Sequence, residues 1–479
     1  MKYYSLKNNN YSGAKKLFEI FPERNAFMNA YGYENVYFIG IGGISMSSLA
    51  MILKNRGVRV AGYDMKRSEI TEDLEKNGIK VNYTYSPDNQ EGFDTVVYTA
   101  AISENDAEML LAKSRGAKII SRAELLGEIT RGYKHSVGVA GTHGKSTTTG
   151  MLCHVMNKAK NDATVLAGAV IPLINSTYYA GNGDIAVFEA CEYKNSYHSM
   201  RPTIRLVLNT ELDHVDFFGN IENVIKSFEK YMDTDSGESE NIALINADCK
   251  NTVLAAKNIK TKTYTFSTQS ENADFYACNI KEENGYYGFD VKAFGKDYCS
   301  IKLSVPGLHN VINATAAAAA SYLCSVDGKC VSEGISEFCG VKRRFEKKGI
   351  LQSGALVIDD YAHHPDEIRA TLKAAKKVCK GRVFCIFQPH TYTRFEALME
   401  DFAKSLSLAD VVVMADVYAA REKNVNGKSS KDIRKYLPSA EYFGSFEEIA
   451  EFIKENAKEG DMAITMGAGD VYKVSDFLF

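Results

Sequence analysis

The stretch that decides the fold is VGVAGTHGKSTTT at residues 137–149, in which apolar residues run into a glycine-rich turn followed by Lys145 and Ser146. A buried strand that ends at such a turn lets backbone N–H groups converge on phosphate oxygens, and the following helix offers the positive end of its dipole. Lys145 can reach the β- and γ-phosphates, and the Ser146 hydroxyl can bind Mg²⁺. Only the second half of the general phosphate-loop pattern is present, since Val139 stands where that pattern has glycine. We predict nucleotide binding, against the plainer interpretation of a strand, turn and helix without a ligand.

Length and composition bound the broad class of the protein. At 479 residues the chain exceeds one hydrophobic core, which predicts roughly two to four domains. Its content of 45% hydrophobic and 24% charged residues is ordinary for a soluble globular protein. A formal net charge of −3 leaves no basic excess to neutralise phosphates, which argues against general nucleic-acid binding. We therefore expect no nucleic acid among its partners.

Cysteine usage and the lack of long apolar runs predict a cytoplasmic protein. The ten cysteines include no Cys-x-x-Cys pair, which argues against zinc ribbons and disulfide frameworks and favours reduced thiols. A leader at residues 1–31 is polar and of unclear role, and no run is long and apolar enough to cross a bilayer. The small-residue run at 314–320 is too short for that and predicts a tightly packed helix. We expect cytoplasmic localisation without membrane association.

A first glycine-rich turn follows a strand-like apolar run at residues 35–39. Further strands are predicted at 58–63, 95–98 and 117–120. Strands alternating with helical segments predict a small parallel α/β domain, which we place at residues 32–133. Because the turn resembles a dinucleotide fingerprint but has serine in place of the third glycine, it indicates a diphosphate-containing ligand more than NAD. The candidate contacts are Gly40, Gly42, Gly43, Ser45, Met46 and Asp64.

The phosphate loop is followed by two more strands with polar residues at their ends, predicted at 184–188 and 205–208. Glu189 follows the first strand and His214 lies soon after the second, at the edge where open α/β sheets bind ligands. Mg²⁺ prefers oxygen ligands, so Glu189 beside Ser146 is a candidate site, whereas a histidine ligand is less usual and suits Mn²⁺ equally. The residues alone leave open whether Glu189 and His214 bind metal or are hydrogen-bonded strand ends.

Four strands in the last third of the chain each end in a polar cluster. They are predicted at 356–358, 382–387, 411–415 and 462–466. Residues of these clusters include Asp360, Tyr361, His363 and Arg394. A single cluster of this kind is best interpreted as helix caps and loop chemistry. Four clusters at the carboxyl edge of one sheet, in a chain with a phosphate loop, favour a functional role.

Ten motifs taken together resemble those of one family. In chain order they are GIGGISMS, GTHGKSTTT, EACEY, ELDHVDFF, PGLHNVINA, RRFE, DDYAHHPDE, FQPHTYTRF, DVYAAREK and MGAGD. Over about residues 35–472 the chain resembles the Mur ligases, the amino-acid-adding enzymes of peptidoglycan synthesis. The resemblance implies three α/β domains: an N-terminal Rossmann-like UDP-sugar domain, a central P-loop ATPase-type domain at 134–341 and a C-terminal Rossmann-like ligase domain at 342–479.

The resemblance implies an ATP-dependent ligase with UDP-N-acetylmuramate and L-alanine as partners, Mg²⁺ or Mn²⁺ as metal, and a monomer or weak homodimer. The lactyl carboxylate would attack the γ-phosphate of ATP, and Lys145 and the metal would screen the repulsion between two anions. The amine of L-alanine would then attack the acyl phosphate. His363 is the candidate for orienting this amine or accepting its proton, because the ordinary imidazole pKa lies near the operating pH.

The resemblance also assigns site residues, position by position. The ATP contacts would be Gly141, Thr142, His143, Gly144, Lys145, Ser146, Thr147, Asn310 and Tyr361. The metal ligands would be Ser146, Glu189 and His214. The catalytic residues would be Lys145, Arg344, Asp360, His363 and Arg394. Thr391 stands where many members carry a second arginine, so binding of the amino-acid carboxylate would depend more on Arg394, and Asn82-Tyr83 replaces a common Gly-His near the uracil.

Two other classes of function remain open on the sequence. A nicotinamide dehydrogenase would account for the turn at Gly40 but not for the phosphate loop or the segment around His214. A regulatory phosphate-loop NTPase would account for the loop, and ATP turnover without a sugar nucleotide would favour it. Within the family, a relative that attaches a recycled tripeptide is the nearest competitor. The motifs do not determine preference among alanine, serine and glycine.

Overall fold

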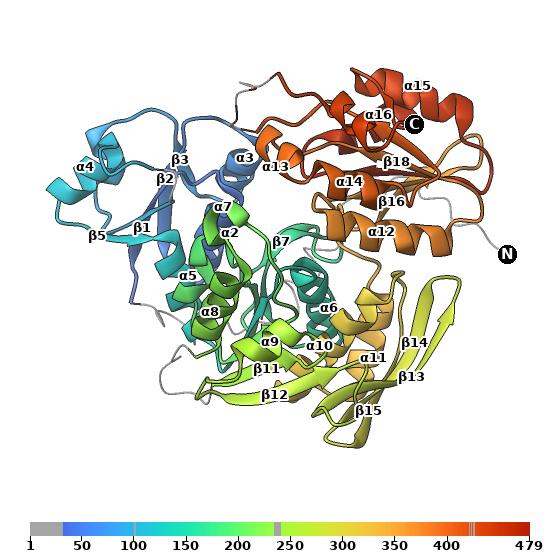
Figure 1. Ribbon diagram of the computed structural model, residues 1–479. Coiled ribbons are helices and arrows are strands. Elements are labelled where there is room, and N and C mark those ends of the chain that lie inside the picture. The colour runs from blue at the N-terminus through green and yellow to red at the C-terminus, as the bar shows by residue number, and fades with distance from the viewer. Residues whose placement is uncertain (1–31, 100–101, 234–240, 421, 423, 425–426) are drawn as a thin grey trace.

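The computed structural model describes residues 32–99, 102–233, 241–420, 422, 424 and 427–479. The leader at residues 1–31 lies outside these ranges. Helices and strands form three α/β units, each built around its own sheet (Figure 1). The predicted fold class, three successive α/β units with largely parallel sheets, is confirmed.

The N-terminal unit contains a five-stranded parallel sheet in the order β3-β2-β1-β4-β5. Its strands are β1 (Asn35–Ile39), β2 (Arg59–Tyr63), β3 (Lys80–Asn82), β4 (Thr95–Tyr98) and β5 (Lys118–Ser121). Its helices are α2 (Ile44–Asn55), α3 (Glu69–Lys76), α4 (Ala107–Ser114) and α5 (Arg122–Arg131). The strand order reverses beside β1, so the glycine-rich turn after β1 lies at the crevice where such sheets bind ligands.

The central unit has a ten-stranded mixed sheet in the order β15-β14-β13-β12-β11-β10-β6-β9-β7-β8. Its strands are β6 (His135–Ala140), β7 (Thr164–Ile171), β8 (Ser176–Tyr179), β9 (Ile185–Glu189), β10 (Ile204–Val207), β11 (Ile242–Asn246), β12 (Lys262–Ser267), β13 (Phe275–Glu283), β14 (Tyr286–Ala293) and β15 (Lys296–Lys302). Its helices are α6 (Lys145–Lys158), α7 (Val215–Phe218), α8 (Ile221–Met232), α9 (Lys250–Ala255), α10 (His309–Leu323) and α11 (Gly328–Glu337). Because β6 pairs in parallel with β9 and β10, the carboxyl ends of these strands meet where α6 begins.

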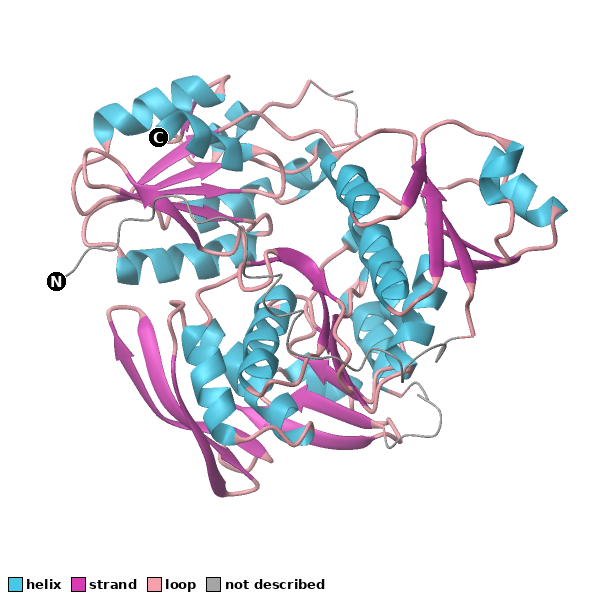
Figure 2. Cartoon of the chain, turned by 180° about the vertical axis from the view of Figure 1, so that it is seen from behind, coloured by secondary structure: helices cyan, strands magenta, loops and turns pink. Residues whose placement is uncertain are grey.

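Strands β13 to β15 form an antiparallel extension of this sheet for which the sequence analysis made no prediction. Buried and half-buried residues alternate along most of β14, as in a sheet with one covered face. Asn284-Gly285 forms the turn between β13 and β14, with φ angles of +52° and +83°, and this dipeptide is a hairpin signal. The hairpin reaches towards the C-terminal unit (Figure 2), where Lys377 Nζ lies 2.6 Å from the Glu282 carboxylate.

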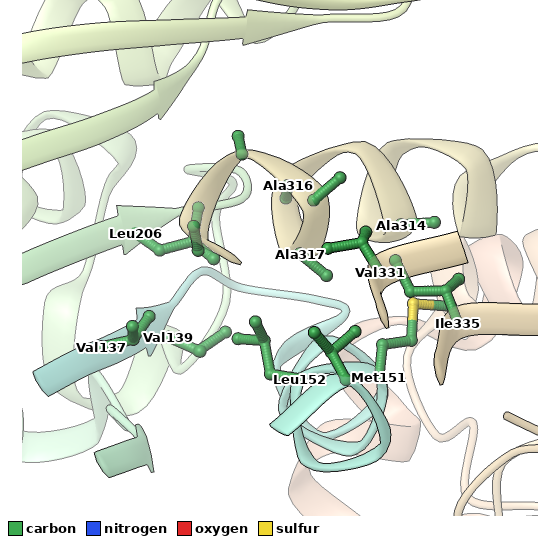
Figure 3. Packing of buried hydrophobic residues seen from close by; sticks show 14 of the residues in the cluster. Val137, Val139, Met151, Leu152, Leu206, Ala314, Ala316, Ala317, Val331 and Ile335 are labelled. Atoms are coloured by element: carbon green, nitrogen blue, oxygen red, sulfur yellow. The ribbon is translucent and has the colours of Figure 1, made fainter. Parts of the chain in front are cut away.

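The core beside the phosphate loop is packed from helices α6, α10 and α11 against the central strands (Figure 3). Val137 and Val139 on β6 face Leu152 on α6, and all three are fully buried. The alanines at 316–320 of α10 are also fully buried, and their small side chains let the helix lie close to its neighbours. The tightly packed helix predicted from the small-residue run is therefore confirmed.

The C-terminal unit has a six-stranded sheet in the order β16-β17-β21-β18-β19-β20, parallel except for β16 at one edge. Its strands are β16 (Glu346–Ile350), β17 (Leu356–Asp360), β18 (Val383–Phe387), β19 (Val411–Met414), β20 (Glu441–Tyr442) and β21 (Met462–Met466). Its helices are α12 (Pro365–Val378), α13 (Tyr392–Ala397), α14 (Met399–Leu406), α15 (Phe446–Asn456) and α16 (Val474–Leu478). The four predicted strands are β17, β21, β18 and β19, which lie side by side, so their polar clusters share one edge.

The N-terminal and central units meet where α5 packs against the 3₁₀ helix η2 (Tyr193–Ser199). The Thr130 hydroxyl accepts the backbone N–H of Arg201 at 2.9 Å. A Cβ on Gly127 would lie 1.9 Å from the carbonyl oxygen of Ser199, so this contact admits no side chain at that position. Within the described ranges, no helix is both long and apolar enough to cross a membrane.

Candidate active site

A cavity of about 710 Å³ lies between the carboxyl edge of the central sheet and the C-terminal unit. The phosphate loop lines it from the central unit, together with Glu189 and Asn310. Arg344, Asp360 and Glu367 line it from the C-terminal side. Site residues predicted in different parts of the chain, among them Lys145 in the central unit and Arg344 in the C-terminal unit, therefore line one cavity.

The phosphate loop has the predicted order of strand, glycine-rich turn and helix. β6 ends at Ala140 and α6 begins at Lys145. Gly144 caps the helix in the left-handed region with φ of +86°, and a Cβ there would lie 2.4 Å from Asn313 Oδ1. No acidic residue lies in the first turn of α6, so the positive helix terminus is left to attract an anion.

Lys145 is held by Glu192, a carboxylate that was not among the predicted site residues. Its Nζ lies 2.9 Å from Glu192 Oε2 and donates to the carbonyl oxygen of Thr142 at 3.1 Å. Burial lowers the pKa of Lys145, but the charges of Glu192 and Glu189 outweigh burial and raise it to about 12. Burial raises the pKa of Glu192, but Lys145 and His214 bring it below its ordinary value. The pair is therefore fully ionised at neutral pH.

The candidate metal ligands lie around the same loop. Ser146 and Glu189 both line the cavity, and Glu189 Oε2 accepts the backbone N–H of Gly168 at 2.7 Å. His214 Nε2 lies 3.6 Å from Glu192 Oε1. Among the described residues there is no group of three or more His, Cys, Asp or Glu side chains arranged to hold a metal.

His143 reaches across to the C-terminal unit. Its Nδ1 lies 3.2 Å from Glu367 Oε1, its Nε2 lies 3.4 Å from Glu211 Oε2, and its backbone N–H donates to Asn209 Oδ1 at 2.8 Å. Burial lowers the pKa of His143, but the two carboxylates outweigh burial and raise it to about 10. The ring is therefore an imidazolium that donates from both nitrogens at neutral pH.

Arg344 and Asp360 lie on the C-terminal wall of the cavity. Arg344 Nη1 is 3.6 Å from Glu367 Oε1, and its guanidinium lies 5.3 Å from the centre of the Tyr361 ring. Asp360 accepts backbone N–H groups from Phe345 at 2.7 Å and from Ala362 at 2.8 Å. Burial raises the pKa of Asp360 to about 6, although Arg344 lowers it. Asp360 thus shapes the turn that carries Arg344.

His363 follows β17 and is held in one tautomer. Its Nδ1 lies 3.0 Å from the carbonyl oxygen of Tyr361, which can only accept, so Nδ1 carries the proton and Nε2 is free to accept one. Burial lowers the pKa of His363, so the ring is neutral at physiological pH. A neutral imidazole with an accepting nitrogen can act as a general base.

Arg394 lies on α13, outside the residues that line the cavity. It forms no ion pair with any carboxylate of the described residues. Burial raises the pKa of Asp213, but the neighbouring His214 and the charge of Arg394 lower it below its ordinary value. Arg394 therefore lies near the phosphate-loop edge with its guanidinium available to an anion.

The other predicted contacts lie at two separate places. Gly42 N–H donates to Asp64 Oδ2 at 2.8 Å, and Arg122 Nη1 donates to Ser45 Oγ at 3.0 Å, so the turn after β1 is braced by an acid and a base. The Met46 side chain is only 2% exposed and belongs to the core. Asn310 lines the cavity, and its Nδ2 donates to the carbonyl oxygen of Pro306 at 2.7 Å.

Three family models match successive parts of the chain: Mur ligase family, catalytic domain at 35–134, Mur ligase middle domain at 139–321, and Mur ligase, glutamate ligase domain at 343–469. A curated UDP-N-acetylmuramate--L-alanine ligase of Caldicellulosiruptor saccharolyticus is 45% identical over 92% of this chain and 97% of that protein. One from Agathobacter rectalis is 44% identical over 93% and 97%. The chain belongs to the Mur ligase family.

Solved structures of other Mur ligases show the same architecture. A UDP-N-acetylmuramate-alanine ligase from Thermotoga maritima matches with a TM-score of 0.75 and 30% identity, over 93% of this chain and 98% of that chain. A murein peptide ligase from Psychrobacter arcticus matches with a TM-score of 0.65 and 25% identity, over 93% and 97%. The three matched Mur ligase models correspond to the three sheets described above.

Three acidic residues of the site were not selected from the sequence, although the Mur ligase motifs contain them. They are Glu192 in EACEY, Glu211 in ELDHVDFF and Glu367 in DDYAHHPDE. Each is paired with a predicted cation of the phosphate loop, either Lys145 or His143. The sequence did carry a signal for them. Lys145 and His143 belong to the predicted phosphate loop, which follows a buried strand, and buried cations need neighbouring anions to offset the loss of solvation.

Proposed function

We propose that this chain is an ATP-dependent ligase that joins L-alanine to the lactyl carboxylate of UDP-N-acetylmuramate in peptidoglycan precursor synthesis. The products would be UDP-N-acetylmuramoyl-L-alanine, ADP and phosphate. The observation that carries the proposal is the cavity in which the phosphate loop faces Arg344 and the His363 segment. The curated relatives named for this reaction, at 40–45% identity over most of the chain, support it.

In the first step the lactyl carboxylate attacks the γ-phosphorus of ATP, a C–O–P linkage forms and the bond to ADP breaks. Two anions approach, so the site must supply positive charge. Lys145 and the N-terminus of α6 supply it on the nucleotide side, and Arg344 supplies it from the opposite wall. Ser146, Glu189 and His214 would hold a Mg²⁺ ion, or Mn²⁺, which supplies further charge to the phosphates.

In the second step the amine of L-alanine attacks the acyl-phosphate carbon, an amide forms and phosphate leaves. The attacking ammonium must first lose a proton, and Nε2 of His363 is the acceptor that its hydrogen bonding leaves free. Arg394 offers a planar fork for the carboxylate of the amino acid. Thr391 is uncharged and cannot share this role.

The remaining assignments follow the three units. Residues 32–133 would hold UDP-N-acetylmuramate, with the diphosphate at the turn after β1. There the first turn of α2 contains no acidic residue, and Arg122 adds a positive charge beside Ser45. Residues 134–341 would hold ATP and residues 342–479 would present the amino acid. We propose a cytoplasmic enzyme that is a monomer or weak homodimer.

Phosphate release tests the function directly. ATP and Mg²⁺ are combined with and without UDP-N-acetylmuramate and with each of L-alanine, L-serine, glycine or a cell-wall tripeptide. We expect release only when the sugar nucleotide and an amino acid are both present, with the highest rate for L-alanine. Release with ATP alone would instead indicate a phosphate-loop NTPase, and release only with the tripeptide would indicate a peptide-recycling ligase.

A further inference from the structure

Glu367 is a buried carboxylate that contacts both sides of the cavity. Its side chain is 13% exposed, and its Oε1 lies 3.2 Å from His143 Nδ1 and 3.6 Å from Arg344 Nη1. Its Oε2 accepts the backbone N–H of His363 at 3.1 Å. One carboxylate thus joins the phosphate loop, the segment that enters the C-terminal unit and the loop after β17.

The charges around Glu367 depend on one another. His143 and Arg344 are both positive and both lie in the same partly desolvated space, where like charges repel strongly. Glu367 lies between them. Burial raises its pKa, but His363, the hydrogen bond from His143 and the charge of Arg344 together hold it well below the ordinary value. A carboxylate paired in this way is ionised throughout the neutral range. If it were removed, Arg344 would lose this ion pair and His143 would keep only Glu211, so the two cations would face each other without their shared anion.

The backbone fixes the position of this carboxylate. Glu367 is the third residue of α12, whose N-cap is His364 and whose first residue is Pro365. A negative charge in the first turn of a helix is stabilised by the helix dipole. The first turn of α12 therefore fixes where the Glu367 carboxylate lies relative to the phosphate loop.

We propose that Glu367 is a positioning residue that fixes the phosphate loop against the C-terminal unit by holding His143 and Arg344 together. A nucleotide then meets the loop and Arg344 in one preset arrangement. The inference rests on the proposed function only in that the cavity binds ATP.

The sign of the effect on nucleotide binding separates this role from simple proximity. Glu367 is an anion beside the expected phosphate site. If it acted only through its charge on the nucleotide, the change Glu367→Gln would relieve repulsion and tighten binding. If it positions His143 and Arg344, the same change releases both cations from their shared partner and weakens binding.

The first test is calorimetric titration with a non-hydrolysable ATP analogue and Mg²⁺, without sugar or amino acid. We expect Glu367→Gln to weaken binding by about tenfold or more. Glu282→Gln is the matched control, because it removes another ion pair between the same two units, Lys377 to Glu282 at 2.6 Å, away from the cavity. It should leave the dissociation constant within about twofold. Unchanged or tighter binding by Glu367→Gln would overturn the proposal.

The second test asks whether Glu367 acts through His143. His143→Gln and the double variant are titrated beside Glu367→Gln, and melting temperatures show that each is folded. Because coupled residues do not act additively, the dissociation constant of the double variant should be about the same as that of whichever single variant binds the analogue more weakly. Effects that multiply in the double variant would contradict the proposal. If Glu367→Gln does not fold, His143→Gln must still weaken binding, and wild-type affinity in His143→Gln would overturn it.

Kinetics separate this inference from the proposed ligase activity. Saturating UDP-N-acetylmuramate and L-alanine are used while ATP is varied, and then L-alanine is varied at saturating ATP. We expect Glu367→Gln to raise the KM for ATP more than the KM for L-alanine, and an equal change in both would count against a role at the loop. A wild-type protein that binds the analogue but ligates nothing would refute the proposed function and leave the binding test of Glu367 in force.

Discussion

At the scale of single residues, the site is organised by ion pairs whose members are distant in sequence. Lys145 and Glu192 are 14% and 3% exposed, and their charged atoms lie 2.9 Å apart. A buried pair of this kind contributes little when compared with an apolar pair, but breaking it by removing one partner is costly. Changes at Lys145 therefore act on stability as well as on chemistry.

Lys145→Ala should abolish ligation if, as we propose, the charge of Lys145 stabilises the transferring phosphoryl group. Such a loss is commonly about 2–4 kcal/mol of transition-state stabilisation, roughly a hundred- to a thousand-fold in rate. The variant should also melt at a lower temperature, since buried Glu192 loses its closest cation and keeps only His214 at 3.6 Å. Adding Glu192→Gln should restore the melting temperature but not the rate. Near-wild-type amide formation by the single variant would refute the role of Lys145.

Glu189→Gln tests the metal assignment. If Glu189 helps to hold the cation, the amide keeps the shape but loses the charge, and the Mg²⁺ concentration for half-maximal rate should rise several-fold. The titration is made at saturating substrates, with Glu337→Gln as control, because Glu337 pairs with Lys158 at the surface. An unchanged Mg²⁺ titration would show that Glu189 serves only to accept the Gly168 N–H.

Asp360 should make stability depend on pH. Its folded-state pKa of about 6 is above the unfolded value near 4 because burial disfavours the carboxylate. The unfolded chain therefore loses this proton first, and the contribution to stability is fully present below about pH 4 and lost as pH rises through about 6. Relative to Asp360→Asn, the wild type should lose up to about 3 kcal/mol between pH 4 and pH 7. Melting curves of both proteins across this range measure it, and a constant difference would contradict the assignment.

At the scale of elements, the contact between α5 and η2 sets how the N-terminal and central units meet. Gly127 lies against the backbone of Ser199, and η2 directly follows the Glu189–Glu192 segment of the site. The position of the N-terminal unit, which we propose holds the sugar nucleotide, is thus coupled to the strand end that carries the metal candidate.

Gly127→Ala should force α5 and η2 apart, because the added Cβ has no space. Overpacking of this kind typically costs about 1–3 kcal/mol, and we expect a lower melting temperature together with a higher KM for UDP-N-acetylmuramate. Gly288→Ala is the control, since a Cβ there would meet only the Ile301 carbonyl oxygen at 3.8 Å. Equal melting temperatures for the two variants would show that the interface adapts.

At the scale of the whole molecule, no single unit carries a complete site. The phosphate loop belongs to the central unit, and Arg344, His363 and Arg394 belong to the C-terminal unit. The His143–Glu367 contact joins the two units at the cavity that we propose binds the nucleotide. Closure of such units around substrates is a usual way to exclude water before an activated intermediate forms.

Arg394→Lys should raise the KM for L-alanine more than the KM for ATP. Lysine keeps the charge but loses the bidentate geometry towards a carboxylate, a difference of about 1–3 kcal/mol, or roughly five- to a hundred-fold. Initial rates against L-alanine, with ATP and UDP-N-acetylmuramate saturating, measure the effect. If only the KM for ATP changes, Arg394 contacts the nucleotide and the amino-acid pocket lies elsewhere.

The sequence by itself determined the features that depend on neighbours in the chain. Apolar runs followed by glycine or polar turns predicted β1, β6 and β21, and the order of strand, turn and helix predicted the phosphate loop. These patterns are local, since strand periodicity and turn chemistry act over a few residues. Parallel strands share a direction, so their carboxyl ends lie along one edge of the sheet, where ligands bind. This placed Asp360 and His363 together with the polar residues at the other strand ends.

Only the tertiary structure decided which charges meet. Glu192 pairs with Lys145 across 47 positions and Glu367 with His143 across 224, and no local pattern encodes separations that packing creates. The same holds for Gly127 against Ser199 and for the addition of β13 to β15 to the parallel sheet. Which predicted site residues line the cavity was also a matter of packing, since Arg344 and Asp360 line it whereas His363 and Arg394 do not.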